Sequence, residues 1–260
     1  MSIEVKCLLK SRHPGCPDLI TVQARYPRFI HSEVMTHRVF SRSASSSRAI
    51  PIERMIQDVL DDPAMPVQWG SNKPGMQAGD EIENIDYAHE IWLDACRQAV
   101  YDAKRLANQG LHKQIVNRVL EPFAHISVII TATDWQNFFD LRCHPSADPT
   151  MRALAEAMRK AIDETPATDL DAGQWHLPYG GSLPESAARC ARVSYLRHDG
   201  SAPTNADDMR LAALLRAERH MSPFEHQAQP RPGKCFGNLR GWLSQRVAIE
   251  DMVPVEGVAV

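Results

Sequence analysis

The sequence lacks the short motifs that mark several large classes of enzymes. It contains no G-x-G-x-x-G, no G-x-x-x-x-G-K-[ST] and no G-x-S-x-G segment. These absences exclude the dinucleotide-binding fingerprint, the P-loop and the nucleophile elbow of the hydrolases. Any nucleotide or flavin must therefore be held by side chains and helix ends rather than by a glycine-rich cradle.

Metal and disulfide signals are absent as well. The six cysteines are scattered without a C-x-x-C pair, and a chain of this length has little need of a disulfide framework. His220 and His226 are separated by a spacing that zinc sites do not use. We therefore expect no metal, and interpret these histidines as structural residues or as partners of a ring-shaped cofactor. The cysteine usage is typical of a reducing cytoplasm.

Neither a membrane nor a nucleic acid is indicated as a partner. No apolar run approaches the length of a membrane span, and residues 1–6 lack the apolar core of a signal peptide. The formal net charge is −3, whereas proteins that bind nucleic acid in bulk are usually basic. This balance still allows a local basic pocket.

A candidate for such a pocket is the stretch 37–48, H-R-V-F-S-R-S-A-S-S-S-R, which is rich in arginine and serine. Unpaired charge is costly to bury, but arginine forks and serine hydroxyls together suit a phosphate group. On composition alone, a solvated serine-rich loop explains the stretch equally well.

Hydrophobic periodicity predicts one mixed α/β domain over residues 1–260. We expect strands at 3–9, 19–24 and 125–133. We expect helices at 29–40, 51–60, 81–110, 112–119, 134–142, 149–163, 184–195, 207–220 and 238–250. Residues 61–80 are predicted to form a long loop, and residues 165–183 a connector.

Arg118 and Arg142 lie on two of these helices among apolar neighbours, so we expect both to be largely buried. Together with Arg38, Arg42 and Arg48 they are candidates for one electropositive pocket. The alternative is that the stem of each helical arginine covers the rim of the core while its head reaches water.

Three blocks of the sequence resemble the flavin-dependent thymidylate synthases. His37, Arg38, Ser41, Ser46 and Arg48 match the family signature H-R-x-x-S-x-x-x-x-S-x-R. Arg118, Pro122 and the segment N-F-F-D-L-R that ends at Arg142 resemble its R-x-x-x-P and N-F-x-x-L-R elements. The segments R-C-A-R-V-S-Y (189–195) and R-H-M-S-P-F-E-H (219–226) resemble its A-A-R-V-S and H-x-[ST]-P-F-E-H elements.

The order of the blocks differs from that of the family. There the P-F-E-H block precedes the signature, whereas here it follows it. We therefore expect a circularly permuted and divergent member, in which residues 165–183 join the old ends. Such a rearrangement is tolerated when the old ends lie close together at the surface.

The resemblance implies an α/β (α+β) fold, with an antiparallel sheet flanked by long helices, and a homotetramer whose active sites are shared between subunits. It implies a methyltransferase that binds FAD, is reduced by NADPH and takes methylene from 5,10-methylenetetrahydrofolate. The expected reaction is transfer of this carbon to C5 of dUMP, which gives dTMP.

The family's functional positions are carried over residue by residue. Arg142 matches the catalytic arginine that polarises the uracil ring. The cofactor-binding positions are matched by His37, Arg38, Asn137, Ser194, His220 and Ser222. The substrate-binding positions are matched by Glu33, Thr36, Ser46, Ser47, Arg48, Arg118 and Arg142.

The signature also departs from the family pattern. Thr36 replaces an arginine, Glu33 replaces a glutamine, and Ser43 and Ala44 replace an Asn-Glu pair. Since a carboxylate would repel phosphate, we expect Glu33 either to accept a hydrogen bond from an amino group, as cytosine offers, or to pair with Arg48.

Three alternatives therefore stay open. The enzyme acts on another pyrimidine nucleotide such as dCMP, or it gives a hydroxymethyl product. The third is a non-catalytic module that binds phosphate or nucleic acid through the arginine–serine stretch.

Overall fold

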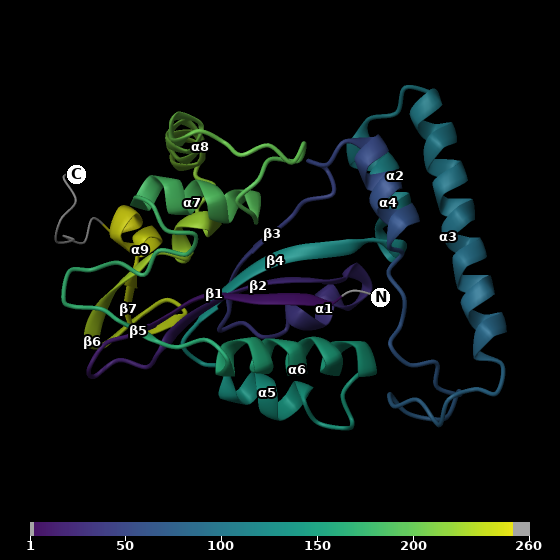
Figure 1. Ribbon diagram of the computed structural model, residues 1–260, viewed down its shortest axis with the longest axis horizontal. Helices are drawn as coiled ribbons and strands as arrows, with labels where there is room; N and C mark the ends of the chain where they lie inside the picture. The colour runs from purple at the N-terminus through teal and green to yellow at the C-terminus, as the bar shows by residue number, and fades with distance from the viewer. Residues whose placement is uncertain (1–2, 252–260) are drawn as a thin grey trace.

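A five-stranded sheet lies at the centre of the protein, whose computed structural model describes residues 3–251. Its strands are β1 (Glu4–Arg12), β2 (Leu19–Pro27), β3 (Ser41–Ala44), β4 (His125–Ala132) and β5 (Thr168–Asp169). Their order in the sheet is β3-β4-β2-β1-β5 (Figure 1). All neighbours are antiparallel except β1 and β5. The predicted mixed fold with an antiparallel sheet is therefore confirmed.

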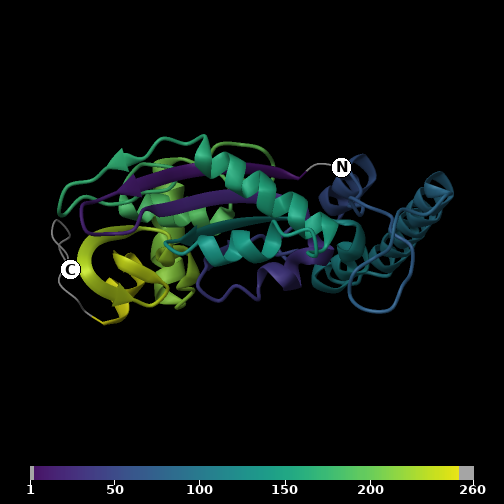
Figure 2. The ribbon, with the colours of Figure 1, turned by 90° about the horizontal axis from the view of Figure 1, so that it is seen from below.

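One face of the sheet is apolar. Alternate residues of a strand point to the same side, and on this side of β2 and β4 they are apolar. Val22 pairs with Ile130 and Ala24 with Val128 in the register of β2 and β4, and all four are buried in one cluster. This face is covered by α5 (Gln136–Arg142) and α6 (Pro149–Asp163) (Figures 1 and 2). Each large side chain that α6 buries here contributes roughly 1.5–3 kcal/mol of hydrophobic stabilisation.

The opposite face of the sheet carries many polar side chains. Part of it is covered by α7 (Leu183–Arg192), against which Ile129 packs, and by the 3-10 turn η3 (Ser222–Glu225). Helix α8 (Asn205–Ala217) packs on the outside of α7. A capping box formed by Ser182 and Glu185 fixes the start of α7.

Three helices form a second apolar cluster at one end of the sheet (Figures 1 and 2). They are α2 (Ile52–Asp61), α3 (Ile85–Asn108) and α4 (Lys113–Leu120), and the 3-10 turn η2 (Glu121–Phe123) leads from α4 to β4. Helix α3 starts at 85 rather than at the predicted 81, because the side chain of Asn84 accepts a hydrogen bond from Tyr87 N and caps it.

The predicted last helix at 238–250 is wrong over most of its length. Residues 228–244 form a hairpin of β6 (Ala228–Phe236) and β7 (Leu239–Ser244), and only α9 (Gln245–Glu250) is helical. The chain reverses at Gly237, whose φ of +58° suits glycine. Trp242 and Leu243 are buried.

The predicted helix at 29–40 is also much shorter. It consists of the 3-10 turn η1 (Arg28–Ile30) and one turn of α1 (His31–Val34). The Arg42 guanidinium donates hydrogen bonds to the carbonyl oxygens of Val34 and His37. Val34 O also accepts from His37 N at 3.3 Å, an i+3 contact of the 3-10 type in place of the i+4 bond that a continuing α-helix would need.

Candidate active site

The side chain of Arg142, on the last turn of α5, joins α5 to α1 and the turn that follows it. Its Nε donates to His37 Nε2 at 3.0 Å, and its two terminal nitrogens donate to Thr36 Oγ1 at 3.1 Å and to Glu33 Oε2 at 3.4 Å. We call these four residues the Arg142 cluster. The structure thus brings together three predicted substrate residues and one predicted cofactor residue.

His37 is neutral in this cluster. An arginine side chain has donors but no acceptor, so Nε2 must accept and the ring proton must lie on Nδ1. The ring is only 7% exposed and lies edge-on to Phe138, with a centroid distance of 4.8 Å. Burial, followed by the charges of Arg142 and Arg42, lowers the pKa of His37.

Glu33 pairs with Arg142 and not with Arg48. Burial and the nearby carboxylate of Asp148 raise the pKa of Glu33, while Arg142 opposes that shift. Since Arg142 uses only Oε2 of Glu33, a ligand at the cluster would meet guanidinium donors and a carboxylate acceptor side by side.

A second group of predicted residues lies in the loop that follows β3. Ser45 extends the ladder to β4 by donating its N–H to Ser127 O. The hydroxyl of Ser47 is buried and donates to Glu121 Oε1 at 2.6 Å. This anchoring leaves Ser46 and Arg48 exposed on either side of Ser47.

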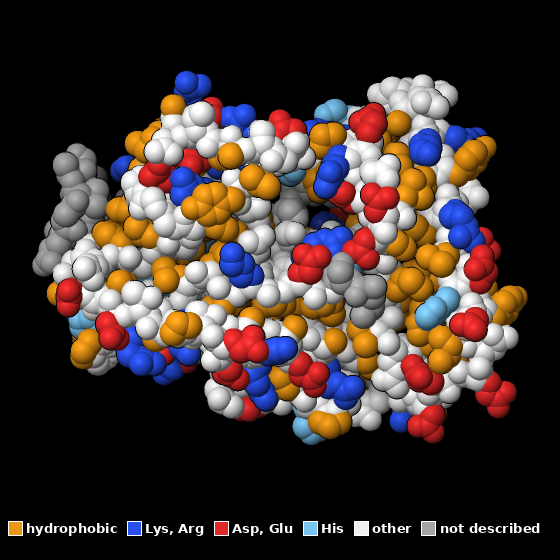
Figure 3. Space-filling view, viewed as in Figure 1, with side chains coloured by type: hydrophobic (Ala, Val, Ile, Leu, Met, Phe, Trp, Pro, Cys, Tyr) orange, Lys and Arg blue, Asp and Glu red, His pale blue; other side chains and the backbone are white. Residues whose placement is uncertain are grey.

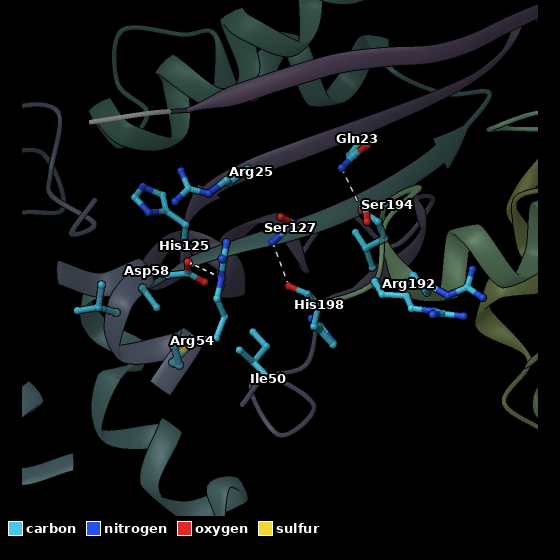
Figure 4. A pocket seen from close by; sticks show the side chains of 16 residues that line it. Gln23, Arg25, Ile50, Arg54, Asp58, His125, Ser127, Arg192, Ser194 and His198 are labelled. Carbon is cyan, nitrogen blue, oxygen red and sulfur yellow. Dashed lines mark hydrogen bonds and ion pairs between the residues drawn. The ribbon is translucent and has the colours of Figure 1, made fainter. Parts of the chain in front are cut away.

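A polar cavity of about 340 Å³ opens beside this loop. Ser45 and Ile50 line it from the loop, β2 and β4 form its floor, and α2 and residues 192–198 form its walls (Figure 4). The space-filling view shows the surface hollowed between the side of α7 and that of α2, with charged side chains at the rim (Figure 3).

Arginines dominate the charge of this cavity. Four line it, and each is paired with an aspartate: Arg25 with Asp62, Arg54 with Asp58, Arg192 with Asp208 and Arg197 with Asp207. Of these aspartates only Asp58 lines the cavity. The cavity is therefore lined by four guanidinium groups, whereas most of the aspartates that pair with them lie outside its lining. This arrangement favours an anionic or strongly polar ligand.

The prediction that five arginines share one pocket is wrong for a single copy of this chain. Arg142 belongs to the helices on the apolar face of the sheet, whereas the cavity and its loop lie on the polar face. Arg118 is exposed rather than buried and lies on α4, which packs beside α2 at one end of the sheet, whereas α5 lies below the middle of the sheet (Figure 1). In the described residues 3–251, neither Arg48 nor Arg118 forms an ion pair or a side-chain hydrogen bond.

The predicted cofactor residues other than His37 lie on several elements. Arg38, Asn137, His220 and Ser222 are exposed and belong to the turn after α1, to α5 and to the region of η3. Ser194 lines the cavity, and its hydroxyl donates to Leu196 O at 2.8 Å.

A buried chain of hydroxyls and imidazoles, which the sequence analysis missed, crosses the polar face of the sheet. Five hydrogen bonds of 2.6–3.0 Å link Ser11, His176, Thr21, Thr131, His226 and Ser43 in that order. Every member is at most 6% exposed. We call this the cross-sheet chain. The only local signal was the polar residues Thr21, Gln23 and Arg25 at alternate positions of β2.

Neither a metal site nor a membrane-spanning helix is found among the described residues 3–251. Among residues 3–251, no group of three or more His, Cys, Asp or Glu side chains is arranged to hold a metal ion. Within the same range no helix is both long and apolar enough to cross a bilayer.

The fold and the two arginine-bearing sites define a mixed α/β protein equipped to bind anionic or planar polar ligands. A family model described as "Thymidylate synthase complementing protein" matches residues 17–166, more than half of the chain. The chain therefore belongs to the flavin-dependent thymidylate synthase family and is an enzyme of that type. No curated protein matches it.

Solved structures of PolB from Streptomyces cacaoi, a UMP/dUMP methylase, are similar to the chain. The complex with 5-Br dUMP has 16% sequence identity and a TM-score of 0.52, over 63% of this chain and 90% of that chain. The complex with 5-Br UMP has 18% identity and a TM-score of 0.48, over 63% and 89%. The first of these likenesses supports the assignment of the fold.

Proposed function

We propose that this enzyme transfers a one-carbon unit from 5,10-methylenetetrahydrofolate to C5 of a pyrimidine deoxynucleotide, with dUMP as the first candidate substrate, dTMP as product and NADPH as reductant. The observation that carries the proposal is the Arg142 cluster. It holds the residue at the family's catalytic position by three hydrogen bonds, in a chain that belongs to the family.

The role proposed for Arg142 is electrostatic. A fixed guanidinium stabilises negative charge that develops on a nearby ring, because its donors are already oriented before the reaction. Glu33 reduces the net charge of the cluster but adds an acceptor. That acceptor supports a second candidate substrate, dCMP, whose C4 amino group is a donor where dUMP has a carbonyl.

The phosphate of the nucleotide is proposed to bind Ser46, Arg48 and Arg118. Support comes from their exposure, and from the absence of side-chain partners for both arginines among the described residues. Arginine forks that are not already paired are suited to bidentate contact with phosphate.

The residues proposed to hold FAD fit such a role in their chemistry. Arg38, Asn137, His220 and Ser222 offer exposed donors for a phosphate or a flavin ring. When bound and reduced by NADPH, the flavin would supply the hydride that reduces the transferred carbon. His37 fits direct contact with the flavin less well, because its buried Nε2 is occupied by Arg142.

The nucleotide site is proposed to form between copies of the chain in a homotetramer. This follows from the separation of the Arg142 cluster from Arg48 and Arg118 within one protomer. Coexpressing an Arg48→Ala chain with an Arg142→Ala chain should restore part of the activity that each variant loses alone. Mixed tetramers without any activity would contradict shared sites.

We further propose that the motif order results from circular permutation. His226 of the P-F-E-H block donates to or accepts from Ser43 of the signature strand at 3.0 Å, although 183 residues separate them. This contact supports the idea that the two blocks belong to one ancestral unit, with residues 165–183 as the joint.

The mass of the nucleotide product tests the proposed function. Purified protein is incubated with FAD, NADPH and 5,10-methylenetetrahydrofolate, together with either dUMP or dCMP. A methyl group gained by dUMP is the expected result. A hydroxymethyl group, or a product from dCMP alone, would show that the pocket has been retuned. Absence of product from both nucleotides would contradict the proposal.

A further inference from the structure

The orientation of Arg142 depends on groups outside its own helix. All three of its nitrogens donate, and the shortest contact, at 3.0 Å, is from Nε to His37 Nε2. The Nε–H lies in the plane of the guanidinium and close to its stem. An acceptor at this position therefore fixes the plane of the guanidinium. Each terminal nitrogen keeps one N–H that is not bonded to Glu33 or Thr36, and these two N–H groups stay available to a ligand.

The imidazole that accepts this hydrogen bond is itself held firmly. Its ring lies edge-on to Phe138 at 4.8 Å and tilted against Phe40 at 5.8 Å, and both phenylalanines are almost fully buried. Arg42 fixes the backbone of the same turn by donating to His37 O at 3.2 Å. The position of His37 Nε2 is therefore set by packing and not by Arg142.

Charged groups from three elements face this ring. Arg142 approaches it from α5 and Arg42 from β3, while Glu33 on α1 lies beyond Arg142 as a counter-charge with Asp148 nearby. Protonated His37 would point its new Nε2–H at the Nε–H of Arg142, so two donors would face each other. The contact exists only while His37 is neutral.

We propose that His37 is a positioning residue for Arg142, whose neutral ring fixes the guanidinium in the plane that the pyrimidine base meets. This role rests on the proposed function, in which Arg142 faces the base. It goes beyond that function because it makes the binding of the base depend on the protonation state of a residue that does not contact the base. Preorganisation of this kind lowers the cost of orienting the ligand.

Two substitutions separate positioning from simple packing. The His37→Gln variant keeps an acceptor at nearly the reach of Nε2 but cannot titrate. The His37→Phe variant keeps an aromatic ring between Phe40 and Phe138 but removes the acceptor. Titration calorimetry with dUMP and with dCMP, from pH 5 to pH 8, measures nucleotide affinity in each protein.

We expect the wild-type protein to lose affinity as the pH falls through the pKa of His37, which burial and the charges of Arg142 and Arg42 hold below the ordinary value of 6.5. The Gln variant should bind close to wild type at pH 8 and show no such loss. The Phe variant should bind about 10-fold or more weakly at every pH. Wild-type affinity in the Phe variant, or an unchanged acid limb in the Gln variant, would overturn the inference.

A second measurement is independent of any ligand. In protein labelled with ¹⁵N-arginine, the Nε–H signal of Arg142, assigned by its absence in Arg142→Lys, should be protected from exchange in the wild type and in the Gln variant at pH 8. It should be lost in the Phe variant. If the wild type binds neither nucleotide, the proposed function fails, and this signal still decides whether His37 holds Arg142.

Discussion

Thr131 lies in the middle of the cross-sheet chain, so its substitution tests what the chain contributes to stability. Its hydroxyl makes two hydrogen bonds, to Thr21 Oγ1 at 2.6 Å and to His226 Nδ1 at 2.8 Å, and the side chain is fully buried. Thr131→Val keeps the shape of the side chain but deletes both bonds. It also leaves a ring nitrogen of His226 without a partner in a site that water does not reach.

The expected loss follows from typical magnitudes. Two hydrogen bonds are worth about 1 kcal/mol each, and an unpaired buried polar group adds about 1–3 kcal/mol, so we expect the free energy of unfolding to fall by at least about 3 kcal/mol. For a protein of this size that corresponds to a Tm lower by roughly 6–12 °C. Urea denaturation followed by circular dichroism measures the change directly.

Matched variants make this test specific. Thr168→Val, on the exposed two-residue strand β5, makes the same chemical change and should shift stability by no more than about 0.5 kcal/mol. Thr21→Val combined with Thr131→Val should cost less than the sum of the single changes, since both partners of one bond are removed. If Thr131→Val behaved like the Thr168 control, the cross-sheet chain would not stabilise the fold.

Three further predictions use other groups. Burial lowers the pKa of both His176 and His226 from 6.5 to about 3. Between pH 6.5 and pH 3 the unfolded chain therefore binds more protons than the folded one. The free energy of unfolding should fall by about 1.4 kcal/mol per pH unit for each ring as the pH drops from 6.5 towards 3. Equal stability by urea denaturation at pH 7.5 and pH 5 would contradict this. Glu33→Gln should move the ratio of kcat/KM values for dUMP and dCMP towards dUMP by about 10-fold, since an amide can donate to a C4 carbonyl and a carboxylate cannot; product mass spectrometry measures this ratio, and an unchanged ratio would remove Glu33 from substrate selection. The start of β1 and the end of α9 lie at opposite ends of the sheet (Figure 1). A chain cut at Gly173, with its original ends joined by a flexible linker of about 40 residues, long enough to span the sheet, should fold and give the same product as the wild type; a variant that aggregates would count against the permuted origin.

Much of the fold could be predicted from local patterns. The strands β1, β2 and β4 and the helix α3 carry regular hydrophobic periods, and the structure contains all four. The hairpin β6–β7 was missed because Pro230 and Pro232 lie within β6, and proline usually argues against a strand. Pro230 still pairs with Trp242, but the register shifts between Pro230 and Cys235, which leaves Pro232 outside the regular ladder.

The candidate site was less predictable, since its contacts join distant parts of the chain. The motifs identified His37 and Arg142 separately, but these two bonded residues are 105 positions apart in the sequence. Whether Glu33 would pair with Arg48 or with Arg142 depended on how α5 lies against α1, which no local pattern encodes. The internal hydrogen bond of Ser47 to Glu121 is likewise a tertiary contact.

The polar face of the sheet also bears on how the chain folds as it is synthesised. Thr131 emerges from the ribosome 95 residues before its partner His226, a delay of roughly 5–20 s at ordinary elongation rates. During that interval water can satisfy the hydroxyls of Thr21 and Thr131, so the uncovered half of the sheet stays wettable. An apolar face left bare for the same time would offer a surface for aggregation. The hydroxyls of Thr21 and Thr131, which later bond to histidines, thus keep this face of the sheet hydrated and less prone to aggregate until the C-terminal segments have been synthesised.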